Sequence, residues 1–466
     1  MKKYIVFITL LSTFWGAFSQ EITGDWNGLL QIKNNQVRIV FHISQNEEGY
    51  VSTMDSPDEG AYGIPASTTT FSEGKLFIEI KAAGVRYEGK MEDGEMISGA
   101  FQPAGLSFPL VLSREMPEKD KIFRPQDPVK PYPYMEENVT FRNESANIEL
   151  AGTLTIPSGA NQTFPVVILI SGSGPQDRNE EWMGHRPFLV LADHLTRQGI
   201  AVLRYDDRGF GESTGDFHEA TSADFATDVE AAISFVKSRP ELDEEHIGLV
   251  GHSEGGLIAP IVAAGSDDVN FIVLMAGPGL TGAEVLIDQV ELIGKTNNWS
   301  DTEIQNEQTR ARNIFRTISN PVSEDSIHKT LVAYLQNEFQ EKSKDGQFNG
   351  LKEEDYLKVM IRQYMRPWLR FFIQYDPANT LKKVTCPVLA INGSEDVQVS
   401  PRNLPLIANA LAEGGNEQVT IKEFSEMNHL FQTCKTCSMS EYDNIEQTIT
   451  PKVMEEISDW IWETIR

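Results

Sequence analysis

The segment HIGLVGHSEGGLIAPIVAA, residues 246–264, decides the fold of the larger part of this 466-residue chain. Its first five residues have the apolar character of a buried β-strand, and residues 251–255 follow as a turn with glycine at both ends. The apolar stretch at 256–264 is typical of a buried helix. A strand that passes through a tight turn into a helix is the repeating unit of a sheet covered by helices.

Similar apolar runs recur on both sides of this segment, as expected for strands that are buried on both faces. They occupy 164–170, 200–205, 271–276 and 387–391, and residues 419–424 are the last predicted strand. Helix-periodic stretches lie between them, for example 222–238 and 403–413. The alternation predicts an α/β fold whose mostly parallel sheet is built from residues 137–279 and 376–466.

The rest of the chain predicts three further parts. Residues 280–375 are polar and helix-periodic, and a segment of that length between two strands predicts a helical cap over the strand ends. Residues 21–115 alternate apolar and polar side chains between glycine-rich turns, which predicts a small antiparallel β sandwich or barrel. The proline-rich residues 116–136 predict an extended linker.

The first twenty residues predict export. Lys2 and Lys3 precede an apolar run that ends near Phe18, and small residues follow where a signal peptidase would cleave, near Ser19 or Gln20. We expect no membrane anchor, because no second apolar run is long enough to span a bilayer. The expected location is periplasmic or extracellular. The formal net charge of -28 argues against a nucleic-acid partner, because phosphates would repel it.

Residues 251–255 match the pattern G-x-S-x-G, and the surrounding strand and helix are the context in which that pattern holds a nucleophile. A turn this tight strains the backbone at Ser253 and leaves no room for side chains at Gly251 and Gly255. The serine oxygen then projects above the sheet, beside the partial positive charge of a helix N-terminus. Ser253 is therefore the predicted nucleophile.

A serine hydroxyl needs a general base, and His429 is the predicted base. It alone of the eight histidines lies beyond residue 328, on a loop after the last predicted strand. Motifs of this kind are followed along the chain by an acid and then by the histidine. We choose Asp396 as the acid because it follows the strand at 387–391, with the adjacent Glu395 as the alternative. The acid would hold the imidazole and stabilise its protonated form.

Two backbone N–H groups must hold the oxyanion that forms when a serine attacks a carbonyl. One belongs to Glu254, directly after the nucleophile. The other comes from the small-residue loop SGSGP at 171–175, and we assign it to Ser173, with Gly174 as the alternative. The side chain of Glu254 is expected to favour the helix N-terminus.

Two other conspicuous features are interpreted as structural. His252 is expected to pack beneath the turn that carries the nucleophile. The charged run RYDDRGFG at 204–211 is expected to be a turn that is held together by Asp–Arg pairs within it.

These motifs, in this order, resemble the serine aminopeptidase-like branch of the α/β-hydrolase superfamily. The resemblance covers about 137–466 and rests on SGSGPQDR (171–178), YDDRG (205–209), GHSEGG (251–256) and the loops of Asp396 and His429. It extends in particular to secreted bacterial members that carry a β-rich domain before the hydrolase. The resemblance implies a serine hydrolase, but some relatives are esterases and others peptidases, so it leaves the substrate open.

The leading hypothesis is hydrolysis of a small carboxylic ester through an acyl-enzyme on Ser253, His429 and Asp396. A peptidase or aminopeptidase that acts on short peptides with the same triad is the alternative, and an inactive binding protein is a remote third. No metal or cofactor is required. Substrate-binding residues and oligomeric state stay open. The pair Cys434 and Cys437 lacks the further ligands of a zinc site. An oxidising compartment allows a local disulfide between them, and the sequence leaves open whether it forms.

Overall fold

A computed structural model of the chain describes residues 22–32, 35–46, 49–57, 61–81, 84–92, 94–103, 107–117, 124–159, 162–344 and 352–466. The predicted signal peptide at 1–20 lies outside the described residues, and so does part of the predicted linker. The chain divides near residue 119 into two compact units.

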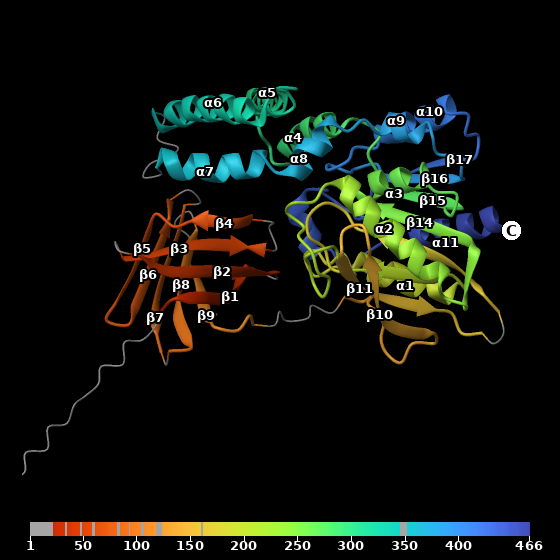
Figure 1. The fold of residues 1–466 in the computed structure, drawn as a ribbon, viewed down its shortest axis with the longest axis horizontal. Coiled ribbons are helices and arrows are strands. Elements are labelled where there is room, and N and C mark those ends of the chain that lie inside the picture. The colour runs from red at the N-terminus through yellow and green to blue at the C-terminus, as the bar shows by residue number, and fades with distance from the viewer. Residues whose placement is uncertain are drawn as a thin grey trace, which may run out of the picture. The chain divides into compact units, whose positions relative to one another are not determined.

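The N-terminal unit is a single antiparallel sheet in the order β4-β3-β2-β1-β9-β8-β7-β6-β5. Its strands are β1 (Gly24–Ile32), β2 (Asn35–Asn46), β3 (Gly49–Ser56), β4 (Ala61–Pro65), β5 (Thr68–Ser72), β6 (Lys75–Ile80), β7 (Val85–Met91), β8 (Met96–Pro103) and β9 (Phe108–Ser113). The two ends of the sheet approach one another, since the hydroxyls of Ser52 on β3 and Thr69 on β5 form a buried hydrogen bond of 2.8 Å. Of the two shapes predicted, the structure therefore corresponds to the barrel-like one (Figure 1).

The second unit contains a mixed sheet in the order β10-β11-β13-β12-β14-β15-β16-β17. Its strands are β10 (Met135–Asn143), β11 (Ile148–Ile156), β12 (Phe164–Ile170), β13 (Ala201–Tyr205), β14 (Leu242–His252), β15 (Phe271–Met275), β16 (Val388–Gly393) and β17 (Val419–Phe424). The pairs β10–β11 and β11–β13 are antiparallel, and the strands from β13 to β17 pair in parallel. The antiparallel hairpin β10–β11 was not predicted.

Helices cover both faces of this sheet (Figure 1). The helices of this unit are α1 (Pro187–Arg197), α2 (Ser222–Lys237), α3 (Gly255–Ala263), α4 (Gly282–Thr296), α5 (Asp301–Ile318), α6 (Glu324–Lys344), α7 (Glu353–Tyr364), α8 (Pro367–Gln374), α9 (Pro377–Leu381), α10 (Asn403–Glu413) and α11 (Pro451–Ile465), with a 3₁₀ helix at Met439–Asn444. Alternate residues of β12 enter different cores, since Ile168 packs with α2 and α3 while Val167 packs with α1 and α11. Every residue of β12 is buried, which explains its unbroken apolar sequence.

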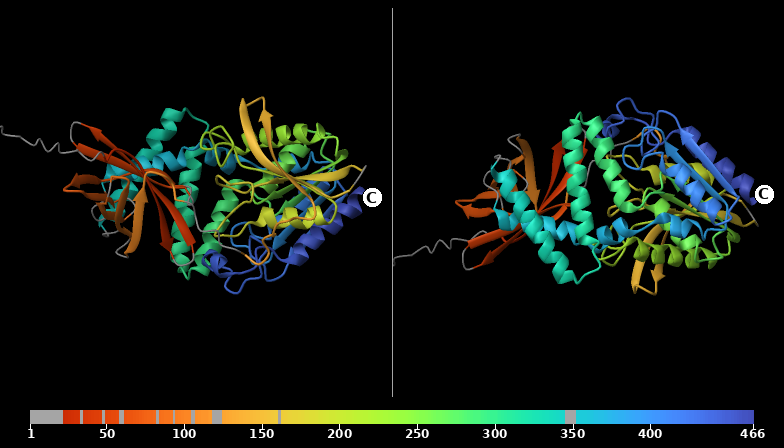
Figure 2. Two further views of the ribbon diagram at one scale, coloured as in Figure 1. Left: turned by 90° about the horizontal axis from the view of Figure 1, so that it is seen from below. Right: turned by 90° about the horizontal axis from the view of Figure 1, so that it is seen from above.

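The predicted cap segment is helical and contains α4 to α8, between β15 and β16. Helices α4 and α8 pack against the core, where Val285 of α4 and Phe372 of α8 form a cluster with Leu257 of α3 and Val399. Helices α5, α6 and α7 pack in turn on α4 and on one another. In Figure 2 these helices, coloured green to cyan, extend from the core of this unit as a helical subdomain. The part of the cap next to the strand ends is therefore α4 and α8.

The charged run at 204–211 is held by ion pairs, but the partners differ from those predicted. Arg208 donates to both oxygens of Asp228 on α2, at 2.7 and 2.9 Å. Asp206 accepts from Arg178 in the loop after β12, at 2.6 and 3.0 Å. Each charge therefore ties the turn to a neighbouring segment, whereas the sequence analysis placed the pairs inside the turn.

The Arg208–Asp228 pair yields a prediction about stability. Both side chains are buried, so Arg208→Met leaves a buried carboxylate without its cation and should lower the free energy of unfolding by about 3–5 kcal/mol. The double variant Arg208→Met/Asp228→Asn removes both charges and should recover most of that loss. Urea unfolding of the two variants and the wild type measures both effects. Equal losses in the single and the double variant would contradict this account.

Candidate active site

Ser253 lies at the turn where β14 ends and α3 begins. Its φ of 53° puts a residue with a side chain in the left-handed region, which glycine usually occupies. The backbone N–H of Ser253 donates to the carbonyl of Met275 on the neighbouring strand β15 at 2.8 Å. The strained conformation is thus fixed by a hydrogen bond to the sheet, as the tight turn in the sequence predicted.

The glycines on both sides of Ser253 are required by close packing. A Cβ atom on Gly251 would lie 2.0 Å from the carbonyl oxygen of Gly255, and a Cβ atom on Gly255 would lie 2.1 Å from the carbonyl oxygen of Ile170. Neither contact is possible for an ordinary side chain. The strand, the turn and the helix can therefore approach this closely only with glycine at both positions.

His429 lies in the loop after β17, and its Nδ1 atom is 2.7 Å from Oδ2 of Asp396. Both side chains are buried. The other oxygen of Asp396 accepts hydrogen bonds from the backbone N–H groups of Gln398 and Val399 at 2.8 and 2.9 Å. Glu395, the alternative acid, is exposed. A carboxylate at Nδ1 leaves Nε2 of the neutral ring as a proton acceptor.

The loop of His429 contacts the turn of Ser253 through His252, the residue that directly precedes Ser253. Nε2 of His252 lies 3.0 Å from the carbonyl oxygen of His429, and the centroids of the two rings are 4.7 Å apart. Among the described residues, no hydrogen bond joins the hydroxyl of Ser253 to the ring of His429. In structures without substrate such bonds are often long. The structure thus brings the two loops together around His252.

The loop after β12 packs directly on the nucleophile turn. A Cβ atom on Gly172 would lie 3.2 Å from Cβ of Ser253. The N–H of Gly172 already donates to Oε1 of Glu180 at 2.8 Å. In the described part of the chain, the N–H groups of Glu254 and Ser173 donate to no backbone or side-chain acceptor. Gly174 follows with a φ of 94°. Among the described residues, neither predicted donor is therefore taken by an acceptor of the protein, whereas the N–H of Gly172 is.

The side chain of Glu254 has a different role from the one predicted. It does not cap α3. Its Oε1 atom accepts from the hydroxyl of Ser222 at 2.6 Å and from the indole N–H of Trp368 on α8 at 2.8 Å. Burial raises the pKa of the Glu254 carboxyl above its usual value, and the hydrogen bonds from Ser222, Trp368 and Ser173 offset part of the rise. This carboxyl group therefore connects the turn of Ser253 to the cap helix α8 and to the loop after β12, called the oxyanion loop below (residues 171–175).

Three residues of this arrangement were missed by the sequence analysis, namely Glu180, Ser222 and Trp368. Ser222 and Glu180 lie in polar stretches where nothing distinguishes them from their neighbours. Trp368 lies in the aromatic run that ends the cap segment, which was a usable signal that this end faces the core. Identifying its partner required the fold.

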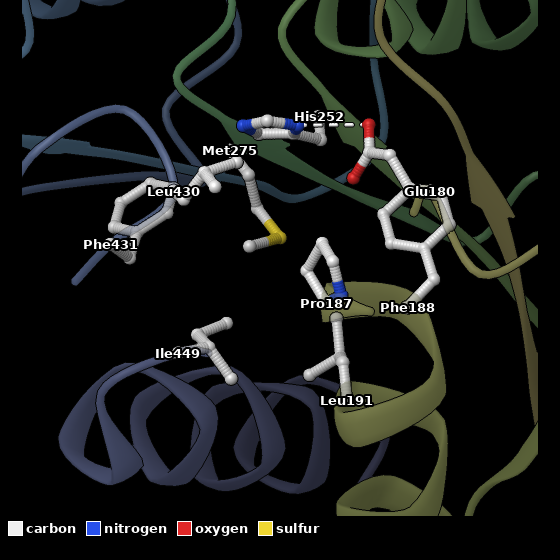
Figure 3. A pocket seen from close by; sticks show the side chains of 9 residues that line it. All are labelled: Glu180, Pro187, Phe188, Leu191, His252, Met275, Leu430, Phe431 and Ile449. Carbon is white, nitrogen blue, oxygen red and sulfur yellow. Dashed lines mark hydrogen bonds and ion pairs between the residues drawn. The ribbon is translucent and has the colours of Figure 1, made fainter. Parts of the chain in front are cut away.

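Figure 3 shows a small cavity behind His252. Its wall is mainly apolar and comes from α1, β15 and the loops after β17, and its polar members are Glu180 and His252. Ser253 does not line it, so we assign no substrate to this cavity.

Cys434 and Cys437 form a disulfide in the loop that follows His429. Within the described ranges, no group of three or more His, Cys, Asp or Glu side chains is arranged to hold a metal ion. No described helix has the length and apolar character needed to cross a bilayer.

Comparison with known proteins relates this geometry to a family. Residues 186–319 match the profile of a family described as serine aminopeptidase, S33, and the matched segment contains Ser253 but ends before Asp396. The chain is also 26% identical over 335 residues to the esterase EstD of Thermotoga maritima, which covers 72% of this chain and 69% of that protein. The chain is an α/β hydrolase.

Other similar proteins were found at lower identity. The hydrolase is 24% identical to an uncharacterised 31.7 kDa protein of Escherichia coli, over 58% of this chain and 85% of that protein. Among solved structures, an esterase of Pyrococcus furiosus, Pf2001, aligns with a TM-score of 0.41 and 15% identity over 71% of this chain and 93% of that chain. Est1E of Butyrivibrio proteoclasticus aligns with a TM-score of 0.39 and 16% identity over 70% and 98%.

The Glu254 carboxyl of the hydrolase yields a prediction about pH. Because its pKa is raised in the folded state, the stability that comes from its proton is present at low pH and is lost as the pH rises above the usual carboxyl range. Glutamine stays neutral, so the melting temperature of Glu254→Gln relative to the wild type should increase between about pH 5 and about pH 8. Thermal unfolding followed by circular dichroism measures the difference. Glu417→Gln, at an exposed position, is the control. A pH-independent difference for Glu254→Gln would contradict the raised pKa.

Proposed function

We propose that this hydrolase cleaves carboxylic esters through an acyl-enzyme on Ser253. The observation that carries the proposal is the buried hydrogen bond of 2.7 Å between His429 and Asp396. His429 lies in a loop that also contacts the turn of Ser253, and the backbone of Ser253 is left-handed. A serine on a strained turn, an oriented imidazole and two unused N–H groups are the parts that acyl transfer requires.

In the proposed reaction, Oγ of Ser253 attacks the carbonyl carbon of the ester while Nε2 of His429 takes the hydroxyl proton. The N–H groups of Glu254 and Ser173 hold the oxyanion of the tetrahedral intermediate. As the intermediate collapses, the bond to the alcohol oxygen breaks and His429 returns the proton to that oxygen. Water then attacks the acyl-enzyme by the same route and releases the acid. Asp396 stabilises the imidazolium that forms in each half of the cycle.

An aminopeptidase with the same residues is the second candidate, and the description of the matched family profile favours it. Such an enzyme needs a free carboxylate near the nucleophile to bind the ammonium group of a peptide. The carboxyl group of Glu254 already accepts from Trp368, and Asp288 of α4 pairs with Arg402 at 2.6 Å. Neither of these two carboxyl groups is therefore free to bind the ammonium group.

We also propose that the hydrolase is exported. The sequence of residues 1–20 has the pattern of a signal peptide. The disulfide between Cys434 and Cys437 supports the proposal, because disulfides persist in oxidising compartments.

Substrate class is tested with a panel of p-nitrophenyl acyl esters and aminoacyl p-nitroanilides. We expect turnover of the esters, and we expect Ser253→Ala to lower kcat by roughly 10⁴- to 10⁶-fold because it removes the nucleophile. Faster turnover of anilides than of esters would favour the peptidase. Ester hydrolysis that survives Ser253→Ala would refute the nucleophile, and a wild type without activity on either series would favour a binding protein.

Asp396 and Glu395 provide a matched pair of variants. Asp396→Asn removes the charge beside Nδ1 of His429 and allows the wrong tautomer, so we expect kcat for esters to fall by about 10⁴-fold. Glu395→Gln changes the adjacent exposed side chain in the same way and should leave kcat within about twofold. Steady-state kinetics on one ester measures both. The reverse ranking would make Glu395 the acid.

A further inference from the structure

A second buried pair of titratable side chains lies behind the nucleophile turn, and the proposed reaction does not use it. His252 is 5% exposed and Glu180 is 4% exposed. Nδ1 of His252 lies 2.9 Å from Oε1 of Glu180, the contact drawn as a dashed line in Figure 3. Both side chains line the small cavity of Figure 3, which Ser253 does not line.

The hydrogen-bond partners of His252 define its protonation state. A backbone carbonyl can only accept, so the bond of 3.0 Å to the carbonyl of His429 requires a proton on Nε2. A carboxylate at Nδ1 requires a second proton there. Burial lowers the pKa of His252, but the charge and hydrogen bond of Glu180 and the bond to His429 more than offset it, and the pKa is raised overall. The two contacts and the raised pKa favour a ring that is protonated on both nitrogens and donates in two opposite directions.

Glu180 extends the connection to the oxyanion loop. The same oxygen that faces His252 accepts the N–H of Gly172 at 2.8 Å. Gly172 directly precedes Ser173, whose N–H is a proposed oxyanion donor. Glu180 itself has a φ of 52°, a strained conformation that is kept only where the surroundings hold it. An unbroken set of hydrogen bonds thus runs from Gly172 through Glu180 and His252 to the carbonyl of His429.

We propose that Glu180 and His252 are positioning residues that hold the oxyanion loop and the loop of the general base at a fixed separation on either side of Ser253. The inference rests on the proposed function, because it concerns the geometry of that same reaction. Asp396 orients the ring of His429, and the Glu180–His252 pair locates the backbone that carries this ring and the backbone that carries Ser173. The pair touches neither the substrate nor the reacting atoms.

Net stability is a weaker explanation of the pair. A buried ion pair contributes little compared with well-packed apolar side chains of similar size. Its directional hydrogen bonds, in contrast, fix the relative position of three chain segments that are far apart in the sequence. Displacing a catalytic group by about 1 Å can lower a rate by roughly 100-fold.

The test is a double-mutant cycle with Glu180→Gln and His252→Asn. The amide introduced by Glu180→Gln carries no charge to keep His252 protonated, and the asparagine introduced by His252→Asn is too short to reach the carbonyl of His429. We expect each single variant to lower kcat for an ester by about 10- to 100-fold with KM within about twofold. The double variant should be no slower than the slower single variant, because both substitutions break the same connection. Effects that multiply would overturn the proposal.

A transition-state analogue separates positioning from a general loss of structure. Affinity for an alkyl trifluoromethyl ketone, which becomes an oxyanion on Ser253, should fall in parallel with kcat/KM, while KM for the ester stays near that of the wild type. All rates are expressed per active site titrated with a fluorophosphonate, so unfolded protein is not counted. His194→Gln is the matched control, because His194 is a partly buried histidine of α1 that contacts Ser458 of α11, and it should leave kcat unchanged.

The outcomes distinguish this inference from the proposed function. If Ser253→Ala keeps its activity, the proposed function fails and the positioning role fails with it. If Ser253→Ala is inactive but Glu180→Gln and His252→Asn keep kcat within about twofold of the wild type, only the positioning role is overturned. If both variants, and also His252→Gln, which keeps a donor near the position of Nε2, fail to fold, the pair is structural and the proposal is overturned.

Discussion

The left-handed backbone at Ser253 is the constraint on which the rest of this site depends. A residue with a side chain adopts that conformation at a cost in free energy, so the surrounding structure must hold it there. The hydrogen bond to Met275 on β15 and the contacts of Gly251 and Gly255 do so. The carbonyl of Ile170 at the end of β12 lies against Gly255, so β12 packs against the same turn. Ser253 and the end of β12, which leads into the loop of Ser173, are therefore positioned by the same close packing.

The sheet brings the other proposed residues to this point. The strands β12, β14, β16 and β17 run in parallel within one sheet, so their carboxyl ends lie along one edge. The loops that follow them carry Ser173, Ser253, Asp396 and His429 in turn. The order of the strands brings these loops near one another. Hydrogen bonds between the loops also require contacts that fix their relative positions more closely. Two buried carboxyl groups contribute such contacts, Glu254 on the cap side and Glu180 on the other side of the turn.

Local patterns predicted much of this arrangement. The strands β12 and β17 and the helix α10 have the predicted bounds. For β12 the reason is burial on both faces of the sheet, which requires an unbroken apolar sequence. Chain order placed the acid in the loop after β16, and the structure brings Asp396 of that loop beside His429. Contacts between residues that are distant in the sequence were predicted poorly. The partners of Arg208 and Glu254 lie in other segments of the chain, and the hairpin β10–β11 was missed because no strand was assigned to its residues.

The central claim is that the oxygen of Ser253 is the atom that becomes acylated. Peptide mapping by tandem mass spectrometry, after reaction of the full chain with a fluorophosphonate, tests this claim most directly. We predict one adduct per chain, on the serine within the sequence GHSEGG, and its absence from chains unfolded before labelling. An adduct on any other residue, or no adduct on a preparation that turns over esters, would contradict the account.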